Sequence, residues 1–414
     1  MIQYIFTSLF FFFLVLFAYI KFRYPFWNVQ PVFHTYDYWR YFYSIPFIIY
    51  KYRPVKTKFC DFYQVETYSY ADCSPKHKRD IVNLLQCYYI PSEKILYTIR
   101  EEDIDLILSG TNETTYMSLF YEKIFQNTDE GETKMIVNSE PIGCITSRPY
   151  KMFYRPTLVE DCYTDILIYM IDYLCVHRER DQAKMNRTLL QTHEYNQRIK
   201  NPNILVSLLK KEIDLFDGVI PLVRYQTNTY YIPKINESVL PAHFIVARIE
   251  DTNKDMLTDF LYNQTHTTYE NMPCLFDICI MQDTAYYLSL VKRGLMHIYC
   301  MYCKEQVYGL YFYKDTTSQY EYVDGTAVQL VSSIMNTTND LLFNAGFLHS
   351  ISQLTKYKND YNLVMIENIG HNITIDAYWN SQNTPIFSNN TAYYLYNMIY
   401  PCSPLLPERC MIIL

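Results

Sequence analysis

The end of the chain carries the group best placed to do chemistry. After Tyr393-Tyr394-Leu395-Tyr396-Asn397 the sequence closes on Met411-Ile412-Ile413-Leu414, a hydrophobic run without a polar tail. Chains that end this way usually bury the end, and a buried carboxylate must be paired or used because charge removed from water is costly. The α-carboxylate of Leu414 is an anion at neutral pH and could act as a general base. A last strand that merely completes a sheet would explain the same residues without any chemistry.

Two further segments extend this pattern. Phe26-Trp27-Asn28-Val29-Gln30-Pro31-Val32 lies near the start, and Ile171-Asp172-Tyr173-Leu174-Cys175-Val176-His177 lies in the middle. With the C-terminal Tyr-Tyr-Leu-Tyr-Asn, they resemble the eukaryotic glycylpeptide N-tetradecanoyltransferases, the N-myristoyltransferase family. That family has F-W-x-T-Q-P-V, I-N-F-L-C-V-H-K and Y-Y-L-Y-N-W in the same order. The resemblance covers residues 25 to 414.

The resemblance implies an α+β fold of two GNAT-like (acyl-CoA N-acyltransferase) halves, with mixed sheets flanked by helices. We expect residues 25–235 to form the half that binds acyl-CoA. Residues 236–414 are expected to bind the peptide and to supply the carboxylate. The implied reaction moves a long-chain acyl group from an acyl-CoA, with myristoyl-CoA as co-substrate, to the N-terminal glycine of a protein. No permanently bound cofactor is implied.

The resemblance also assigns roles to residues. The carboxylate of Leu414 would accept the amine proton, and the backbone N–H groups of Tyr173 and Leu174, at a bulge in a long strand, would stabilise the oxyanion. Losing one such donor in other enzymes costs about 3 to 4 kcal/mol. The residues expected to bind acyl-CoA are Phe26, Trp27, Cys175, Val176, Arg178, Arg180 and Lys184. Those expected to contact the peptide are Glu93, Tyr97, Asp172, Gly218 and Tyr394.

Several positions depart from the family pattern. CoA phosphates favour the free N–H groups at a helix start, where the family has R-S-K-R, but this chain has Asp181-Gln182-Ala183-Lys184. Asp172 replaces the family asparagine, and the Y-T-A-G turn has become Leu215-Phe216-Asp217-Gly218. The acidic run that selects basic peptides retains only Glu93. Two alternatives therefore stay open: a catalytically inactive, membrane-associated binding or structural protein, and a transferase with another acyl length or acceptor.

Composition excludes some classes of function. Half of the residues are apolar and 17% are aromatic, which argues against global disorder. A net charge of −7 argues against nucleic acid as a partner. Twelve cysteines without a tight framework indicate free thiols. The pairs Cys274/Cys279 and Cys300/Cys303 have a spacing compatible with zinc, but they lie in apolar, strand-like text, and we expect no metal.

The first residues predict a membrane anchor. Residues 2–20 contain no charge and would form roughly 28 Å of helix, enough to cross a bilayer. Because Lys21 and Arg23 follow directly, the positive-inside tendency places the rest of a single-pass protein, including its catalytic part, on the cytoplasmic side. We therefore assign residues 1–24 to a transmembrane anchor, with a buried helix as the alternative.

Hydrophobic periodicity predicts the elements that would position these residues. The expected helices are 76–89, 101–108, 116–125, 181–199, 252–262, 283–293 and 328–346, the last capped by Gly346. The expected strands are 165–176, 362–366, a hairpin over 134–146 that turns at Asn138-Ser139-Glu140, and paired strands over 296–313. The two passes share their order of elements, which indicates an internal duplication.

Overall fold

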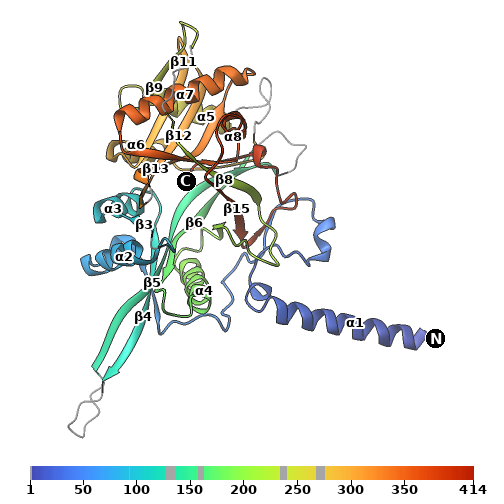
Figure 1. Ribbon diagram of the computed structural model, residues 1–414. Helices are drawn as coiled ribbons and strands as arrows, with labels where there is room; N and C mark the ends of the chain where they lie inside the picture. Colours follow the sequence, from blue (N-terminus) through green and yellow to red (C-terminus); the bar gives the residue numbers. More distant parts are fainter. Residues whose placement is uncertain are drawn as a thin grey trace.

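The computed structural model describes residues 2–92, 94–126, 136–156, 163–233, 240–266, 276–321 and 323–414. These residues form an α+β fold around one mixed sheet of 15 strands, with helices on its faces (Figure 1). The expected fold class is confirmed. A separate pair of short strands, β1 (Phe47–Ile48) and β16 (Met398–Ile399), joins the N-terminal segment to the C-terminal one.

The first half of the chain alternates helices and strands. Its elements are β2 (Val65–Ser69), α2 (Pro75–Tyr88), β3 (Ile95–Tyr97), α3 (Glu101–Ser109), β4 (Tyr116–Gln126), β5 (Ile136–Tyr154), β6 (Thr164–Val176), α4 (Gln182–Lys200), β7 (Val206–Glu212) and β8 (Val223–Tyr231). Strands β5 and β6 are antiparallel, whereas β6 and β7 are parallel and joined through α4.

The second half repeats this plan. Its elements are β9 (Ile245–Arg248), α5 (Lys254–His266), β10 (Ile278–Met281), α6 (Thr284–Arg293), β11 (Met296–Cys303), β12 (Gln306–Tyr320), β13 (Val323–Met335), α7 (Asp340–Tyr357), β14 (Tyr361–Glu367), α8 (Asn372–Asn380), β15 (Phe387–Tyr396) and β17 (Cys410–Ile412). Strands β12 and β13 are antiparallel, and β13 and β14 are parallel across α7. The repeated order inferred from the sequence is therefore present in the structure.

The halves exchange strands. β15 of the second half lies between β7 and β8 of the first, and β8 in turn pairs with β14. β10 pairs with β5, and β3 pairs with β12. Each half therefore completes the sheet of the other.

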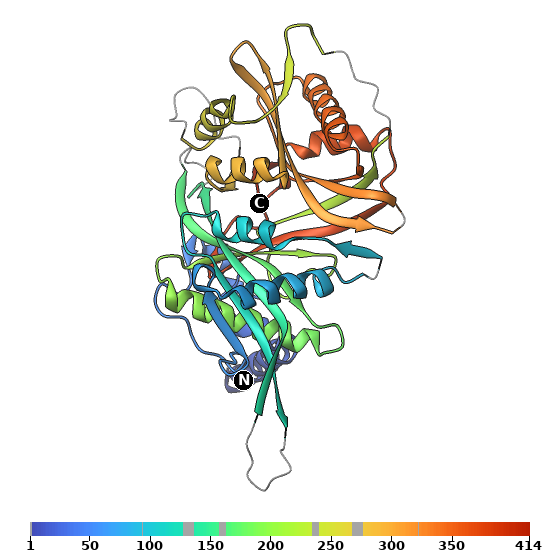
Figure 2. The ribbon, with the colours of Figure 1, turned by 90° about the vertical axis from the view of Figure 1, so that its left-hand side faces the viewer.

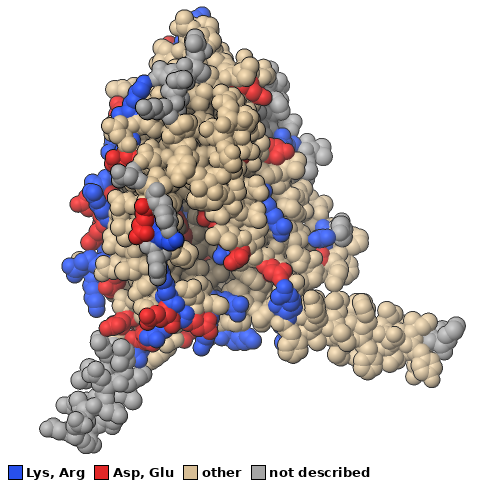
Figure 3. All heavy atoms as spheres, viewed as in Figure 1, with Lys and Arg blue, Asp and Glu red and all other residues tan. Residues whose placement is uncertain are grey.

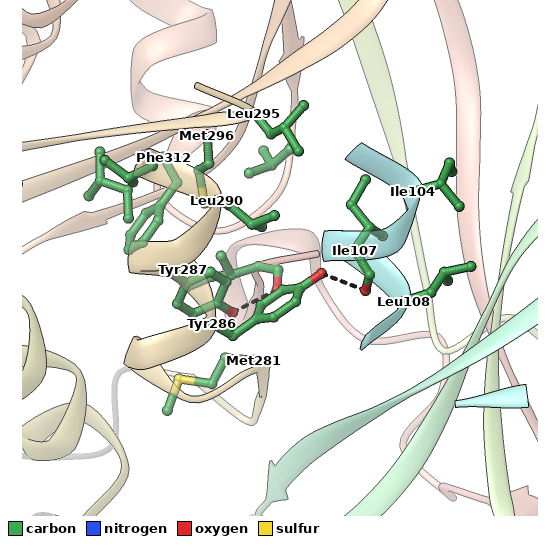
Figure 4. Close-up of a cluster of buried hydrophobic side chains, with 14 of the residues drawn as sticks. Ile104, Ile107, Leu108, Met281, Tyr286, Tyr287, Leu290, Leu295, Met296 and Phe312 are labelled. Atoms are coloured by element: carbon green, nitrogen blue, oxygen red, sulfur yellow. Dashed lines mark hydrogen bonds between the residues drawn. The ribbon is translucent and has the colours of Figure 1, made fainter. Parts of the chain in front are cut away.

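Helices cover the sheet on both faces. In Figure 2, α2, α3 and α6 lie one above another on one face, and the C-terminus lies between α3 and α6. Helix α4 packs on the other face, against β4, β5 and β6. A buried cluster of side chains from α3, α6 and the neighbouring strands fills the space between these helices and the sheet (Figure 4).

Helix α1 (Ile2–Arg23) projects away from the body (Figure 1). It is long and apolar enough to cross a membrane, and its apolar side chains are exposed rather than packed on the protein. This position contradicts the alternative of a buried core helix. At its base, Arg23 forms an ion pair with Asp217 at 2.5 Å, and the ring of Tyr24 stacks on Tyr36 with centroids 5.5 Å apart.

Three predictions of secondary structure were wrong. Residues 116–125, predicted as a helix, form β4. In the helix predicted over 328–346, residues 328–335 belong to β13 instead. Both segments are largely buried and pair with neighbours on both edges, so their apolar residues lack the alternation of a half-exposed strand. The predicted turn at Asn138–Glu140 lies inside β5, which pairs with β4 along its length. Residues 134 and 135 of that hairpin lie outside the described residues.

Gly346 also has another role than the predicted cap. Helix α7 continues past it to Tyr357, and the helix begins after Asn339, whose side chain accepts a hydrogen bond from the Leu342 N–H at 3.1 Å. A Cβ at position 346 would lie 2.3 Å from the Tyr311 hydroxyl oxygen. The glycine therefore allows α7 to pack closely on the sheet.

Candidate active site

Strand β6 contains the bulge that the sequence motif predicted. Cys175 pairs with Cys144 and Asp172 with Thr146, so Tyr173 and Leu174 together oppose a single residue of β5. Tyr173 has a φ of 52°, in the left-handed region that a bulky residue rarely adopts. Bulges of this kind re-aim backbone groups and occur next to active sites.

The bulge divides the predicted residues between two buried clusters. Phe26 and Val176 belong to one cluster, on the side of α4, and Trp27 and Leu174 pack against it. Tyr173 and Cys175 belong to the other, with the end of the chain. Cys175 therefore lies apart from the other predicted acyl-CoA residues, with its Sγ 3.4 Å from the Sγ of Cys144.

Asp172 occupies one of the predicted oxyanion donors. Its Oδ1 accepts a hydrogen bond from the backbone N–H of Tyr173 at 2.9 Å, and its Oδ2 binds Arg148 Nη2 at 2.8 Å. Both side chains are largely withdrawn from solvent, Arg148 at 4% exposed and Asp172 at 17%. Burial alone would raise the pKa of Asp172, but the charges of Arg148 and Lys314 outweigh it and hold that pKa below its usual value. The carboxylate is therefore an anion beside the bulge.

The end of the chain is held in the core against β10 and α6. β17 runs parallel to β10, the Ile413 N–H donates to Ile280 O at 2.9 Å, and Tyr287 Oη donates to Ile413 O at 2.9 Å. Met411 and Ile413 belong to the same buried cluster as Tyr173. Leu414 is half-buried and packs against the neighbouring cluster around β10 and β15.

Helix α6 connects the two features. Arg148 Nη1 donates to Tyr286 Oη at 2.8 Å, and Tyr286 precedes Tyr287, which binds Ile413. In Figure 4 both tyrosines project from α6, and the Tyr286 hydroxyl reaches Ile107 O of α3 at 3.3 Å. A continuous set of contacts thus runs from Asp172 to the last residues.

The predicted phosphate site at the start of α4 is occupied by acidic side chains of the protein. Asp181 caps the helix by accepting the Lys184 N–H at 3.0 Å, and Arg180 pairs with Glu122 at 2.6 Å. Arg178 donates to Ile90 O at 2.9 Å. The side chain of Lys184 is exposed. Two of the three predicted cations are therefore engaged within the chain.

A cavity of about 240 Å³ opens beside Trp27. Its lining consists of Arg23, Tyr24, Pro25, Phe26, Trp27, Arg187, Leu215, Phe216 and Asp217. The rings of Trp27 and Phe216 are 4.5 Å apart, and the Phe216 N–H donates to Tyr394 Oη at 3.1 Å. The predicted substrate residues Gly218 and Tyr394 thus lie on this side.

The remaining predicted substrate residues lie elsewhere. Tyr97 and Asp172 lie by Tyr173 on the other side of β6, where Tyr97 joins the same buried cluster. Glu93 lies outside the described residues. The predicted peptide residues are thus divided between the two sides of β6.

Sequence reasoning missed the charged groups where the halves meet. Arg148 lies in β5 between Ser147 and Pro149, where nothing in the sequence marks it as part of a site. Glu367 of β14, 4% exposed, binds Lys210 of β7 at 2.8 Å and Tyr225 of β8 at 2.8 Å. Burial lowers the pKa of Lys210, but Glu367 more than reverses this effect. Their strands belong to both halves, so no single segment could have revealed the group.

The described residues contain no group of three or more His, Cys, Asp or Glu side chains that could hold a metal ion. Cys279 and Cys300 are buried in β10 and β11. Cys274, the first of the four cysteines with zinc-like spacing, lies outside the described residues.

No protein-family model matches this sequence, and no curated protein matches it. Solved structures do. Saccharomyces cerevisiae N-myristoyltransferase with bound myristoyl-CoA aligns with a TM-score of 0.64 at 11% identity, covering 91% of this chain and 93% of that one. A second structure of the same enzyme with myristoyl-CoA gives 0.65 at 11%, covering 94% of each chain.

The chain has the N-myristoyltransferase fold. A third structure, with myristoyl-CoA and inhibitors, agrees at a TM-score of 0.63 and 12% identity, covering 91% of this chain and 90% of that one. Because the likeness extends over nearly the whole of both chains, it includes both halves. The sequences have diverged to 11–12% identity, so the likeness is one of fold.

Proposed function

We propose that this protein is an acyltransferase that moves a long-chain acyl group from acyl-CoA to the N-terminal glycine of a protein. Myristoyl-CoA is the co-substrate that the shared fold favours. The observation that carries the proposal is the bulge at Tyr173 and Leu174, where Tyr173 shares a buried cluster with Met411 and Ile413 near the end of the chain. A fold without such a reaction has no evident need for a bulky residue with positive φ at this position.

The proposed reaction uses few side chains. The Leu414 carboxylate takes a proton from the glycine ammonium, and the free amine attacks the thioester carbonyl. The N–H groups of Tyr173 and Leu174 stabilise the oxyanion that forms. The intermediate then collapses to an amide and expels the CoA thiolate, which takes up the second amine proton. For full stabilisation the Tyr173 N–H must turn from Asp172 to the oxyanion.

The proposal divides the chain by role. Residues 25–235 hold the acyl-CoA, with the Trp27 cavity as the candidate site for its head group. Residues 236–414 bind the peptide and supply the carboxylate. Helix α1 anchors the protein in a membrane, and Lys21 and Arg23 place the body on the cytoplasmic side.

Transfer assays on the full chain in nanodiscs test this function. A peptide with a free N-terminal glycine should be acylated, and the same peptide with an acetylated N-terminus should not, because it lacks the nucleophile. A series of acyl-CoA lengths identifies the donor. Equal labelling of both peptides would contradict the proposal.

One set of observations favours a second function, that of an inactive acyl-CoA or peptide-binding protein at the membrane. Asp172 holds an oxyanion donor, Asp181 caps the phosphate site, and Glu122 neutralises Arg180. Each of these carboxylates adds negative charge where the oxyanion or the CoA phosphates would lie. Tight acyl-CoA binding without turnover of any glycine peptide would establish this second function.

A further inference from the structure

The segment that follows α1 exposes a group of large apolar side chains. Tyr38, Trp39, Phe42 and Ile45 form what we call the aromatic ridge. Trp39 is 69% exposed and Phe42 is 76% exposed, and their rings are 5.8 Å apart. Adjacent apolar side chains left in water on a folded surface mark an interaction site.

The ridge is presented by a fixed scaffold. The neighbouring Phe33, Tyr43 and Phe47 face inward and pack with Ile220 and Ile399. The pairing of β1 with β16 ties the segment to the C-terminal half. Asp37 accepts hydrogen bonds from the Trp39 N–H at 3.1 Å and from the Tyr43 hydroxyl at 2.9 Å. The inward-facing side chains are thus packed in the protein, whereas those of the aromatic ridge stay exposed to solvent.

The sequence around the ridge is rich in positive charge. Residues 21–63 contain seven basic and two acidic residues, in a chain whose net charge is −7. Lys51, Arg53, Lys56 and Lys58 are exposed, and we call them the basic arm. The two acids bind within the segment: Asp37 as described, and Asp61 through the N–H groups of Tyr63 and Gln64.

The segment lies on the side from which α1 leaves the body, and α2 and α3 lie on the opposite side (Figure 1). The stacking of Tyr24 on Tyr36 connects the helix base to it. Residues 50, 54, 55 and 57 adjoin residues 29–31, a few positions beyond the end of α1. Figure 3 shows basic side chains, with acidic ones beside them, where α1 meets the body.

We propose that the aromatic ridge and the basic arm dock the body on the same bilayer that α1 crosses, on a leaflet with anionic lipids. The inference rests on the proposed anchoring by α1. Aromatic side chains favour the membrane interface, and lysine and arginine are attracted to anionic headgroups. Docking at a second place would stop the body from swinging about α1. It would also hold the Trp27 cavity, lined by Arg23, at the membrane surface, where a long acyl chain is available.

Quenching of tryptophan fluorescence tests this directly. The full chain is placed in nanodiscs of phosphatidylcholine and phosphatidylserine whose acyl chains carry bromine. Of the three tryptophans, Trp379 is buried in the C-terminal half, and Trp27 is half-buried. We expect bromine to quench the wild-type chain and Trp39→Phe to lose that component. Equal quenching of the two proteins would overturn the proposal, including the case in which a protein partner covers the ridge.

Charge variants supply the second arm. Lys51→Gln, Arg53→Gln, Lys56→Gln and Lys58→Gln together should weaken the quenching of Trp39, as should removal of phosphatidylserine. The matched control is Lys76→Gln with Arg79→Gln on α2, which should change nothing. If neither the four substitutions nor the removal of phosphatidylserine changes the quenching, the basic arm has no role in docking. If the full chain fails to enter nanodiscs, the anchoring and the docked surface are both wrong, whereas acyl transfer in detergent is untouched by either result.

Discussion

At the bulge of β6, the N–H of Tyr173 has two competing partners. The Asp172 carboxylate holds it at 2.9 Å, and the proposed reaction needs it for the oxyanion. Because both partners are negative, the ionised Asp172 opposes the charge that develops on the thioester oxygen. Arg148 offsets this charge only in part, since Nη2 alone binds Asp172 while Nη1 binds Tyr286. We therefore expect Asp172 to limit the rate of acyl transfer.

Replacing Asp172 by asparagine tests that limit. Asp172→Asn should raise the rate of acyl transfer by at least about tenfold, because one oxyanion donor is worth about 10² to 10³ in rate. The free energy of unfolding should fall by about 3 kcal/mol, since a buried ion pair loses one partner. Transfer is measured under single-turnover conditions, and stability by urea unfolding.

Two controls accompany this variant. Arg148→Met with Asp172→Asn should recover much of the lost stability, because neither charge is then left unpaired. The pKa of Asp172 is lowered in the folded state, so the pair stabilises the protein above the ordinary aspartate pKa and ceases to do so as pH falls through the lowered value. The stability difference between wild type and Asp172→Asn should therefore shrink in acid. A transfer rate unchanged by Asp172→Asn, with acyl-CoA still bound, would contradict the limiting role.

The bulge itself could be predicted from the sequence, because the Ile171 to His177 motif carries it. The capture of the Tyr173 N–H could not. It depends on Arg148 of β5, 24 residues earlier in the chain, which orients the Asp172 carboxylate. The sequence showed only that a charge had replaced an amide.

At the scale of elements, the start of α4 decides how well phosphate can bind. Free N–H groups and the helix dipole attract anions, but here Asp181 has taken that place. Glu122 of β4 reaches across to Arg180. Helix α4 lies where the sequence predicted it, but Asp181 and Glu122 of the same chain neutralise the positive charge at its start.

Removing these two acids should strengthen the binding of CoA. Asp181→Ser keeps a capping oxygen, and Glu122→Gln releases Arg180. Together they should lower the dissociation constant of CoA about fivefold, because each exposed charge near a helix start contributes about 0.5 kcal/mol. Calorimetric titration measures this. The matched control is Glu102→Gln, which breaks the exposed pair with Arg293 far from α4 and should leave CoA binding unchanged. Unaltered affinity in the double variant would remove α4 from the CoA site.

The junction of α1 with the body depends on a single glycine. Gly218 has a φ of 81°, and a Cβ there would lie 2.6 Å from the Tyr24 ring. Gly218→Ala should therefore cost about 3 kcal/mol of unfolding free energy, from backbone strain and from the clash. Gly294 is the matched control, because its φ of 78° is similar and a Cβ there meets nothing within 4 Å.

Gly294→Ala should cost only the strain, about 1 kcal/mol. Urea unfolding of the two variants gives the difference. Equal losses would mean that Tyr24 does not pack on Gly218 in solution.

Most elements could be predicted from periodicity, and the two segments wrongly predicted as helix share one cause. α2 begins with Ser74 and Pro75, as a helix start should, and its apolar face follows the helical spacing. β4 and β13 are largely buried, and their polar residues, such as Ser118 and Glu122 or Gln329 and Ser332, lie three or four positions apart. That spacing fits a helix, and only strand pairing separates the two structures.

At the scale of the whole molecule, the exchange of β8 and β15 ties the halves together. The polar groups around Glu367 come from three strands of that exchange and are assembled only when both halves have folded. The motif order predicted two similar halves. It could not predict this exchange, since strand order in a sheet depends on pairing between distant segments.

The fold holds the last described residues in the core. β17 is short, pairs only with β10, and brings the last residues into the core beside α6. The chain terminus is thereby turned into a fixed group of the site in the proposed mechanism.

The most direct test replaces the α-carboxylate of Leu414 by an amide. Semisynthesis can give the full chain with a C-terminal amide at Leu414, which keeps the shape and removes the charge. Acyl transfer from myristoyl-CoA to a peptide with N-terminal glycine is then compared with the native carboxylate form. Acyl-CoA binding and thermal unfolding serve as controls. We predict a loss of at least about a hundredfold in transfer, as expected when a general base is removed, with both controls unchanged. An amide form that transfers at the native rate would contradict the account.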